Sequence, residues 1–189
     1  MRKAVFIDRD GTLIKDIPYN ADTALIKLES YAAEMLQSLK RKNFLLIVIS
    51  NQSGVARGFF SEADVNKMHE TIQQKLSAYN IQLDAFYYCP HLTDGTIKEY
   101  SIDCNCRKPK PGLIYKAAKD FDINLNKSWM IGDILNDVEA GKTAGCKTIL
   151  INNGNETEWI LNIQRTPDYE AKNLEDAAQI ILKHELERV

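Results

Sequence analysis

Two carboxylates stand two positions apart near the start of the chain, in the stretch Asp8–Thr12, whose sequence is D-R-D-G-T. A carboxylate can attack phosphorus and form an aspartyl phosphate, while a second carboxylate handles the proton of the leaving group. Side chains two apart on a strand point the same way. We therefore expect Asp8 and Asp10 to face one phosphoryl group.

Three later groups of polar residues could complete such a site. The stretch Ser50–Gly54 offers a hydroxyl and several backbone N–H groups that can hold phosphate oxygens. Arg107 and Lys108 supply positive charge, and Asp133 is followed four positions on by Asp137. Carboxylates gathered at one place repel each other unless a cation binds them, and an oxygen-only ligand set selects a hard ion such as Mg²⁺.

Cysteine and histidine form a separate C-x-H…C-x-C pattern in the middle of the chain. Three thiolates and one imidazole make a closed tetrahedral zinc site with no position left for water, so we expect a structural zinc that staples a loop over residues 89–106. The alternative is a set of free thiols near the surface. Cys146 stands apart and is expected to be a core cysteine. The four predicted zinc ligands are Cys89, His91, Cys104 and Cys106.

Short apolar runs and amphipathic stretches alternate along the chain and must position these groups. This alternation predicts an α/β fold, a doubly wound, Rossmann-like parallel sheet with helices on both faces. Ligands bind beyond the carboxyl ends of such strands, and each polar group follows a predicted strand. The sequence indicates no role for the polar, irregular segment Asn152–Pro167. We predict strands at 4–7, 44–49, 83–88, 128–131 and 147–151, and helices at 29–42, 61–79, 113–121, 137–144 and 174–186.

Length and composition limit the class of protein. With 189 residues, 44% of them hydrophobic and 26% charged, we expect one folded domain over residues 1–189. The formal net charge of −2 argues against nucleic acid as a partner, because phosphate-backbone binding needs a basic excess. No apolar run approaches the length of a membrane span, and the run Ala4–Ile7 is too short for a signal peptide. We therefore expect a cytoplasmic protein without a membrane partner.

Four motifs, in this order, resemble the signature of the haloacid dehalogenase (HAD) superfamily of phosphatases. They are D-x-D-G-T at Asp8–Thr12, a serine at Ser50, a basic residue at Lys108 and G-D-x-x-x-D at Gly132–Asp137. Residues such as Asp-Gly and Asn-Gln-Ser-Gly are also common in ordinary turns, so the resemblance depends on the four motifs together. It implies a HAD-like fold without a large cap domain.

The resemblance also implies roles for these residues. Asp8 would be the nucleophile, and Asp10 would be the general acid and then the base that activates water. Ser50 and Lys108 would stabilise the transferring phosphoryl group. The implied Mg²⁺ ligands are Asp8, the backbone carbonyl of Asp10, and Asp133, with Asp137 close behind.

The cysteine loop resembles that of the zinc-containing branch of heptose 1,7-bisphosphate 7-phosphatases and histidinol-phosphate phosphatases. Three stretches favour the heptose enzymes, namely Ser50–Gly58, Tyr87–His91 and Cys106–Pro109. The heptose enzymes remove the C7 phosphate of D-glycero-D-manno-heptose 1,7-bisphosphate in nucleotide-activated heptose biosynthesis. The resemblance therefore implies a small phosphorylated sugar as substrate, and we expect a monomer.

By the same resemblance, Arg107 would recognise the substrate, together with Lys108. At Ile134 the family often has a lysine that contacts substrate, so this chain has one positive charge fewer near the phosphate. The other implied substrate-binding residues are Asp16, Ile17, Pro18, Tyr19, Ser50, Asn51, Gln52 and Ser53.

Three alternatives remain open at this stage. A histidinol-phosphate phosphatase, or another small phosphosugar phosphatase, would share the fold and the motifs. A phospho-accepting receiver module also uses an aspartyl phosphate with Mg²⁺, but it lacks a second aspartate two positions after the acceptor. A zinc ribbon that binds nucleic acid is disfavoured by the net charge.

Overall fold

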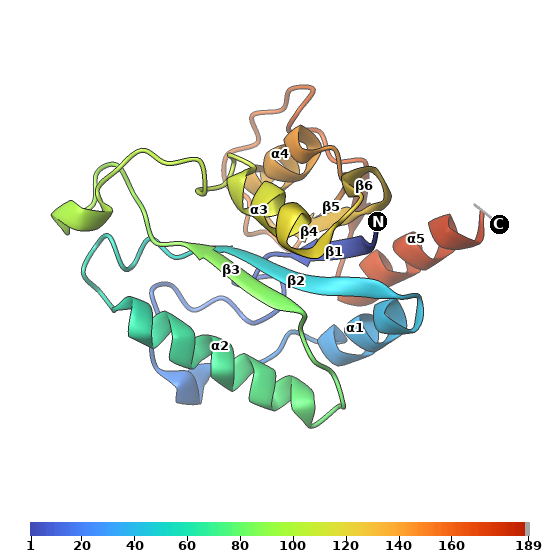
Figure 1. Ribbon diagram of the computed structural model, residues 1–189, viewed down its shortest axis with the longest axis horizontal. Helices are drawn as coiled ribbons and strands as arrows, with labels where there is room; N and C mark the ends of the chain where they lie inside the picture. Colours follow the sequence, from blue (N-terminus) through green and yellow to red (C-terminus); the bar gives the residue numbers. More distant parts are fainter. Residues whose placement is uncertain (188–189) are drawn as a thin grey trace.

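The computed structural model describes residues 1–187 and places a parallel sheet between two layers of helices (Figure 1). The strand order is β3-β2-β1-β4-β5-β6, so the direction of winding reverses between β1 and β4. The predicted doubly wound α/β class is confirmed. The strands are β1 (Lys3–Ile7), β2 (Phe44–Asn51), β3 (Ala85–Cys89), β4 (Trp129–Gly132), β5 (Lys147–Ile151) and β6 (Tyr169–Ala171).

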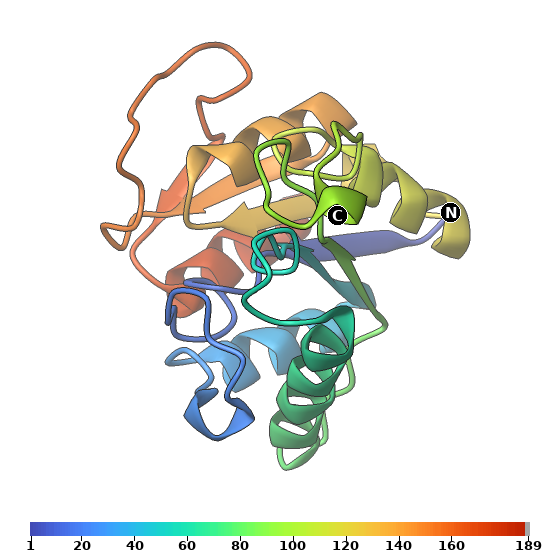
Figure 2. The same ribbon diagram turned by 90° about the vertical axis from the view of Figure 1, so that its left-hand side faces the viewer.

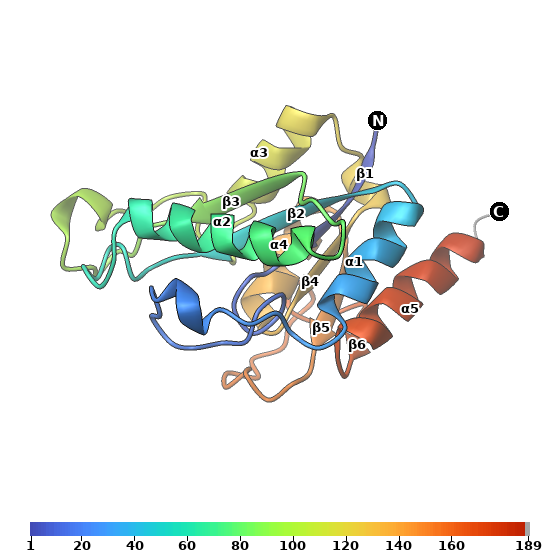
Figure 3. The ribbon, with the colours of Figure 1, turned by 90° about the horizontal axis from the view of Figure 1, so that it is seen from below.

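Both faces of the sheet are covered, which explains why its central strands are continuous apolar runs. Val5 and Ile7 of β1 belong to the core under α1, α2 and α5, whereas Ala4 and Phe6 pack with α3 and α4. Helices α1 and α5 lie side by side on the first face (Figure 3). The helices are α1 (Ala32–Arg41), α2 (Glu62–Ser77), α3 (Gly112–Phe121), α4 (Leu135–Ala144) and α5 (Leu174–Leu186).

The ends of two helices show how local chemistry sets the element boundaries. Ser61 Oγ accepts the backbone N–H of Asp64, and the Asp64 carboxylate accepts the N–H of Ser61, so the predicted N-cap of α2 is confirmed as a capping box. Helix α1 begins at Ala32, three residues later than predicted from Glu29. Tyr31 has a φ of 65°, a left-handed conformation that cannot continue a helix.

The connections at the carboxyl ends of the strands gather at one end of the molecule (Figure 2). Between β1 and α1 the chain forms one 3₁₀ turn, Thr23–Leu25, and between β3 and α3 another, Lys98–Tyr100. Apart from isolated bridges, residues 8–31 and 90–111 contain no β-structure. Among the described residues, no helix has the length and apolarity that a membrane crossing requires.

Candidate active site

A buried lysine lies where the ends of β1 and β2 meet the start of α4. Lys108 is 3% exposed, and its Nζ donates hydrogen bonds to Asp8, to Asp137 Oδ1 at 2.6 Å and to the carbonyl of Ile49 at 2.9 Å. Burial by itself would lower the pKa of Lys108, but Asp137 and Asp8 outweigh it and raise that pKa above its ordinary value. The lysine therefore stays charged.

Three carboxylates surround this one ammonium group. Oxygens of Asp8, Asp133 and Asp137 lie within 4.8 Å of one another, and all three residues are buried. Burial raises the pKa of Asp8, which Asp137 and Asp133 raise further against the opposing effect of Lys108. Burial and Asp137 together raise the pKa of Asp133 to about 6. A divalent cation would relieve this excess of negative charge, and the all-oxygen donor set suits Mg²⁺.

The carboxylate of Asp10 lies apart from this cluster. It accepts hydrogen bonds from Arg9 Nη2 and from Gln52 Nε2, each at 2.9 Å, and Gln52 Nε2 also donates to Ser50 Oγ at 2.7 Å. Strand β1 ends at Ile7, so Asp8 and Asp10 lie beyond it, and the alternation of side chains along a strand does not determine which way they point. Arg9, which is 3% exposed, was missed by the sequence analysis although it stands between the two aspartates.

A cavity of about 390 Å³ opens beside Asp10, and most of the predicted substrate-binding residues line it. All residues in the ranges 16–19 and 51–53 line it, and so does Ile134. Ser50, Arg107 and Lys108 are not among its lining residues. Asn51 Nδ2 donates a hydrogen bond to the backbone carbonyl of Lys108, and Asn51 Oδ1 accepts the backbone N–H of Lys108, both at 3.0 Å. Asn51 therefore also positions the lysine.

Two arginines of the motif segments, Arg57 and Arg107, do not line this cavity. Arg107 Nη1 donates to the carbonyl of His91 at 3.3 Å. The guanidinium of Arg57 lies 5.7 Å from the centroid of the Tyr19 ring, and its buried Nε has no hydrogen-bond partner among the described residues. Sequence reasoning missed Arg57, although it belongs to the Ser50–Gly58 stretch that carried the family resemblance.

The predicted zinc ligands come together in one cluster. Their ligand atoms lie within 4.8 Å of one another, with Cys106 Sγ at 2.8 Å from Cys89 Sγ, 3.1 Å from Cys104 Sγ and 3.2 Å from His91 Nδ1. Hydrogen bonding, chiefly from Cys89, lowers the pKa of the Cys106 thiol to about 5. A thiolate in this group of four suits a tetrahedral zinc site. Cys146 is buried in the core, as expected.

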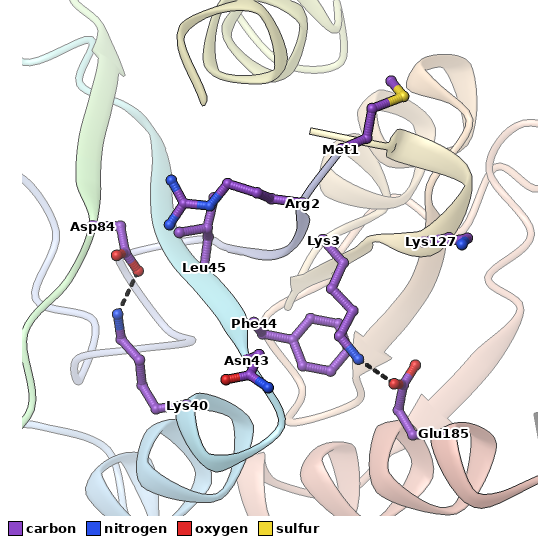
Figure 4. A pocket seen from close by; sticks show the side chains of 10 residues that line it. All are labelled: Met1, Arg2, Lys3, Lys40, Asn43, Phe44, Leu45, Asp84, Lys127 and Glu185. Carbon is purple, nitrogen blue, oxygen red and sulfur yellow. Dashed lines mark hydrogen bonds and ion pairs between the residues drawn. The ribbon is translucent and has the colours of Figure 1, made fainter. Parts of the chain in front are cut away.

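A larger cavity, of about 740 Å³, lies at the opposite, amino-terminal end of the sheet (Figure 4). Two of its cations, Lys3 and Lys40, are ion-paired with Glu185 and Asp84. None of the motif residues lines this cavity, so its size does not make it the site of the chemistry.

Comparison with known proteins agrees with this geometry. A HAD-hydrolase-like family model matches residues 105–177. A D-glycero-β-D-manno-heptose-1,7-bisphosphate 7-phosphatase of Pasteurella multocida is 44% identical over 155 residues, which cover 82% of this chain and 84% of the relative. The chain belongs to this family of HAD phosphatases. A relative of the same name in Escherichia coli K12 is 35% identical, over 84% of this chain and 88% of its own.

Solved structures of HAD phosphatases share the fold. One from Mesorhizobium loti has a TM-score of 0.84 and 28% identity, covering 96% of this chain and 87% of its own. A D,D-heptose 1,7-bisphosphate phosphatase from B. bronchiseptica, complexed with magnesium and phosphate, has a TM-score of 0.77 and 26% identity, covering 96% of this chain and 99% of its own. HAD phosphatases use Mg²⁺, and the predicted enzyme class, a phosphoric monoester hydrolase, is confirmed.

Proposed function

We propose that this chain hydrolyses D-glycero-β-D-manno-heptose 1,7-bisphosphate at C7, in the biosynthesis of nucleotide-activated heptose. The observation that carries the proposal is the similarity to phosphatases of this name, at 35–44% identity over more than four-fifths of both chains. The β configuration of the anomeric phosphate is taken from the names of these relatives.

The buried carboxylates support a role for Mg²⁺ in this reaction. Asp8, Asp133 and the backbone carbonyl of Asp10 would hold the cation, since their oxygen donors and excess negative charge suit it. Bound there, Mg²⁺ supplies positive charge to the phosphoryl oxygens. Lys108 and the Ser50 hydroxyl bind the remaining phosphoryl oxygens.

Asp8 and Asp10 share the chemical steps. A carboxylate oxygen of Asp8 attacks the phosphorus, the bond between phosphorus and O7 breaks, and Asp10 gives its proton to O7. A water molecule then attacks the phosphorus of the aspartyl phosphate and gives a proton to Asp10. The bond between the phosphorus and the Asp8 oxygen breaks, so phosphate is released and the Asp8 carboxylate is regenerated. Asp10 lines the cavity, so its carboxyl group is accessible to the leaving oxygen.

The anomeric phosphate that stays on the sugar needs a cation of its own. Arg107 directly precedes Lys108, and Arg57 lies against Tyr19 at the cavity. We propose Arg107 as the residue that recognises this phosphate, with the lining residues at 16–19 and 51–53 around the sugar. Arg57 provides the comparison, because its guanidinium lies against the ring of Tyr19, which lines the cavity.

We further propose that Cys89, His91, Cys104 and Cys106 bind one structural zinc ion. The segment that they close leads directly into Arg107 and Lys108. With four protein ligands, the ion would have no open position for substrate or water. Its contribution would be to hold the segment that presents the two cations.

Kinetics with a substrate panel test the proposed function. The panel contains both anomers of the heptose 1,7-bisphosphate, histidinol phosphate and simple sugar monophosphates. We expect the highest kcat/KM for the β bisphosphate. Faster turnover of histidinol phosphate than of either bisphosphate anomer would contradict the proposal and favour the histidinol-phosphate enzymes.

A further inference from the structure

The connection between β5 and β6 reaches back to the carboxylate cluster through a short Asn-Gly-Asn turn. Asn155 Nδ2 donates a hydrogen bond to Asp133 Oδ2 at 2.7 Å. Asn153 Nδ2 donates to the carbonyl of Gly11 at 2.9 Å, and its Oδ1 accepts the backbone N–H of Asn155 at 3.2 Å. Gly154 between them has a φ of 91°, which the tight turn requires. The turn therefore links the first motif to the fourth.

Both oxygens of the Asp133 carboxylate are held by hydrogen bonds. Thr12 Oγ1 donates to Oδ1 at 3.3 Å, while Asn155 holds Oδ2. A Cβ atom on Gly11 would lie 2.2 Å from Asp133 Oδ2 and 2.5 Å from Asn155 Nδ2. The glycine of the first motif thus leaves the room in which Asp133 and Asn155 meet.

Two further contacts attach the same connection to α4. Glu156 Oε2 accepts the backbone N–H of Leu135 at 2.5 Å, at the start of the helix. Arg165 Nη1 donates to Asn136 at 3.1 Å and to Glu139 at 3.0 Å. Residues 152–155 are themselves exposed, so the turn is not held by core packing. What its side chains do is bond to residues of the cluster and to the helix that follows it.

We propose that Asn155 is a positioning residue of the divalent-cation site, where it fixes the Asp133 carboxylate in the orientation that binds Mg²⁺. Partners that hydrogen-bond a ligating carboxylate orient it, and their loss typically weakens metal binding about 10- to 100-fold. This inference rests on the proposed function for the role of Asp133 as a metal ligand, but it does not depend on the identity of the sugar.

Calorimetric titration of MgCl₂ into substrate-free protein tests the inference. Asn155→Ala should bind Mg²⁺ about 10- to 100-fold more weakly than wild type. Asn152→Ala is the matched control, because Asn152 lies on the same exposed connection and its side chain bonds Glu170 instead. Its Mg²⁺ affinity should equal that of wild type. With the panel substrate that the wild-type enzyme hydrolyses fastest, Asn155→Ala should need more Mg²⁺ for half-maximal activity and recover a near-normal kcat at saturating Mg²⁺.

The outcomes separate this inference from the proposed function. An Mg²⁺ affinity of Asn155→Ala within twofold of wild type would overturn the positioning role, whatever the enzyme hydrolyses. An equal loss in Asn152→Ala would overturn it too, because the effect would then belong to the whole connection. A lowered melting temperature of metal-free Asn155→Ala with unchanged Mg²⁺ affinity would make the contact merely structural. A failure to hydrolyse the heptose bisphosphate would contradict the substrate assignment and leave the Mg²⁺ result standing.

Discussion

Lys108 contacts two carboxylates that have different environments. Asp137 is 0% exposed and lies in the first turn of α4, whereas Asp8 follows β1 at the winding reversal of the sheet. In the proposed mechanism Asp8 loses its carboxylate charge when it is esterified, and Asp137 remains to balance the ammonium group. The charge of Lys108 would therefore stay compensated while Asp8 acts as the nucleophile.

The nucleophile is tested by Asp8→Asn. The amide cannot form the phosphoryl ester, so turnover should fall by at least about 10⁴-fold, which is typical for loss of a nucleophile. The fold should persist because Lys108 keeps its ion pair with Asp137. Phosphate release and thermal melting measure the two effects. Near-normal rates in this variant would rule out the covalent mechanism.

The second phosphate is tested by Arg107→Ala with Arg57→Ala as comparison. Loss of charge-assisted hydrogen bonds is worth about 1.5–3 kcal/mol, or roughly 10- to 150-fold in kcat/KM. Arg107→Ala should show this loss for the bisphosphate and a much smaller one for a monophosphate. If only Arg57→Ala discriminates between the two substrates, Arg57 rather than Arg107 recognises the anomeric phosphate.

At the scale of the elements, the segment from Cys89 to Arg107 contains one 3₁₀ turn and little apolar surface of its own. Its Cys and His side chains converge within 4.8 Å, and backbone hydrogen bonds such as that from Leu92 N–H to the Tyr100 carbonyl add to this contact. A zinc ion bound to this cluster, as proposed above, would hold the connection in place of a core of its own. Loss of that ion should then affect the adjoining Arg107 and Lys108.

Metal analysis and mutation test this dependence. The purified protein should contain one zinc per chain, and Cys104→Ser should lose it. A closed set of four ligands leaves the zinc no direct part in the reaction, so its loss should act by disordering the segment that leads into Arg107 and Lys108. We therefore expect KM for the substrate to rise in Cys104→Ser. Cys146→Ser changes a buried cysteine outside the cluster and should keep the zinc. Wild-type protein that binds no zinc, prepared without chelator, would contradict the assignment.

The elements also show where sequence patterns stop being informative. Strands β1, β2, β4 and β5 were predictable because burial on both faces produces unbroken apolar runs. Strand β6 was missed, since Tyr169–Ala171 has three residues and only Ala171 is buried. The turn at 153–155 was missed because Asn and Gly are ordinary turn residues. Its role depends on contacts with Gly11 and Asp133, more than 20 positions away.

At the scale of the whole molecule, parallel winding brings four distant motifs to one end of the sheet. That convergence was predictable, because each motif follows a strand and the strands are parallel. The orientation of individual side chains was not, as Asp10 shows by lying against Arg9 and Gln52. The larger of the two cavities described above, at the amino-terminal end, is lined by none of these motifs, so topology locates the site better than volume does.

The regiochemistry of hydrolysis tests the central claim most directly. The β heptose 1,7-bisphosphate is incubated with the enzyme and Mg²⁺, and the products are followed by ³¹P NMR. We predict that the signal of the primary phosphate at C7 disappears as inorganic phosphate appears, while the signal of the anomeric phosphate remains. Release of the anomeric phosphate, with the 7-phosphate as product, would contradict the account.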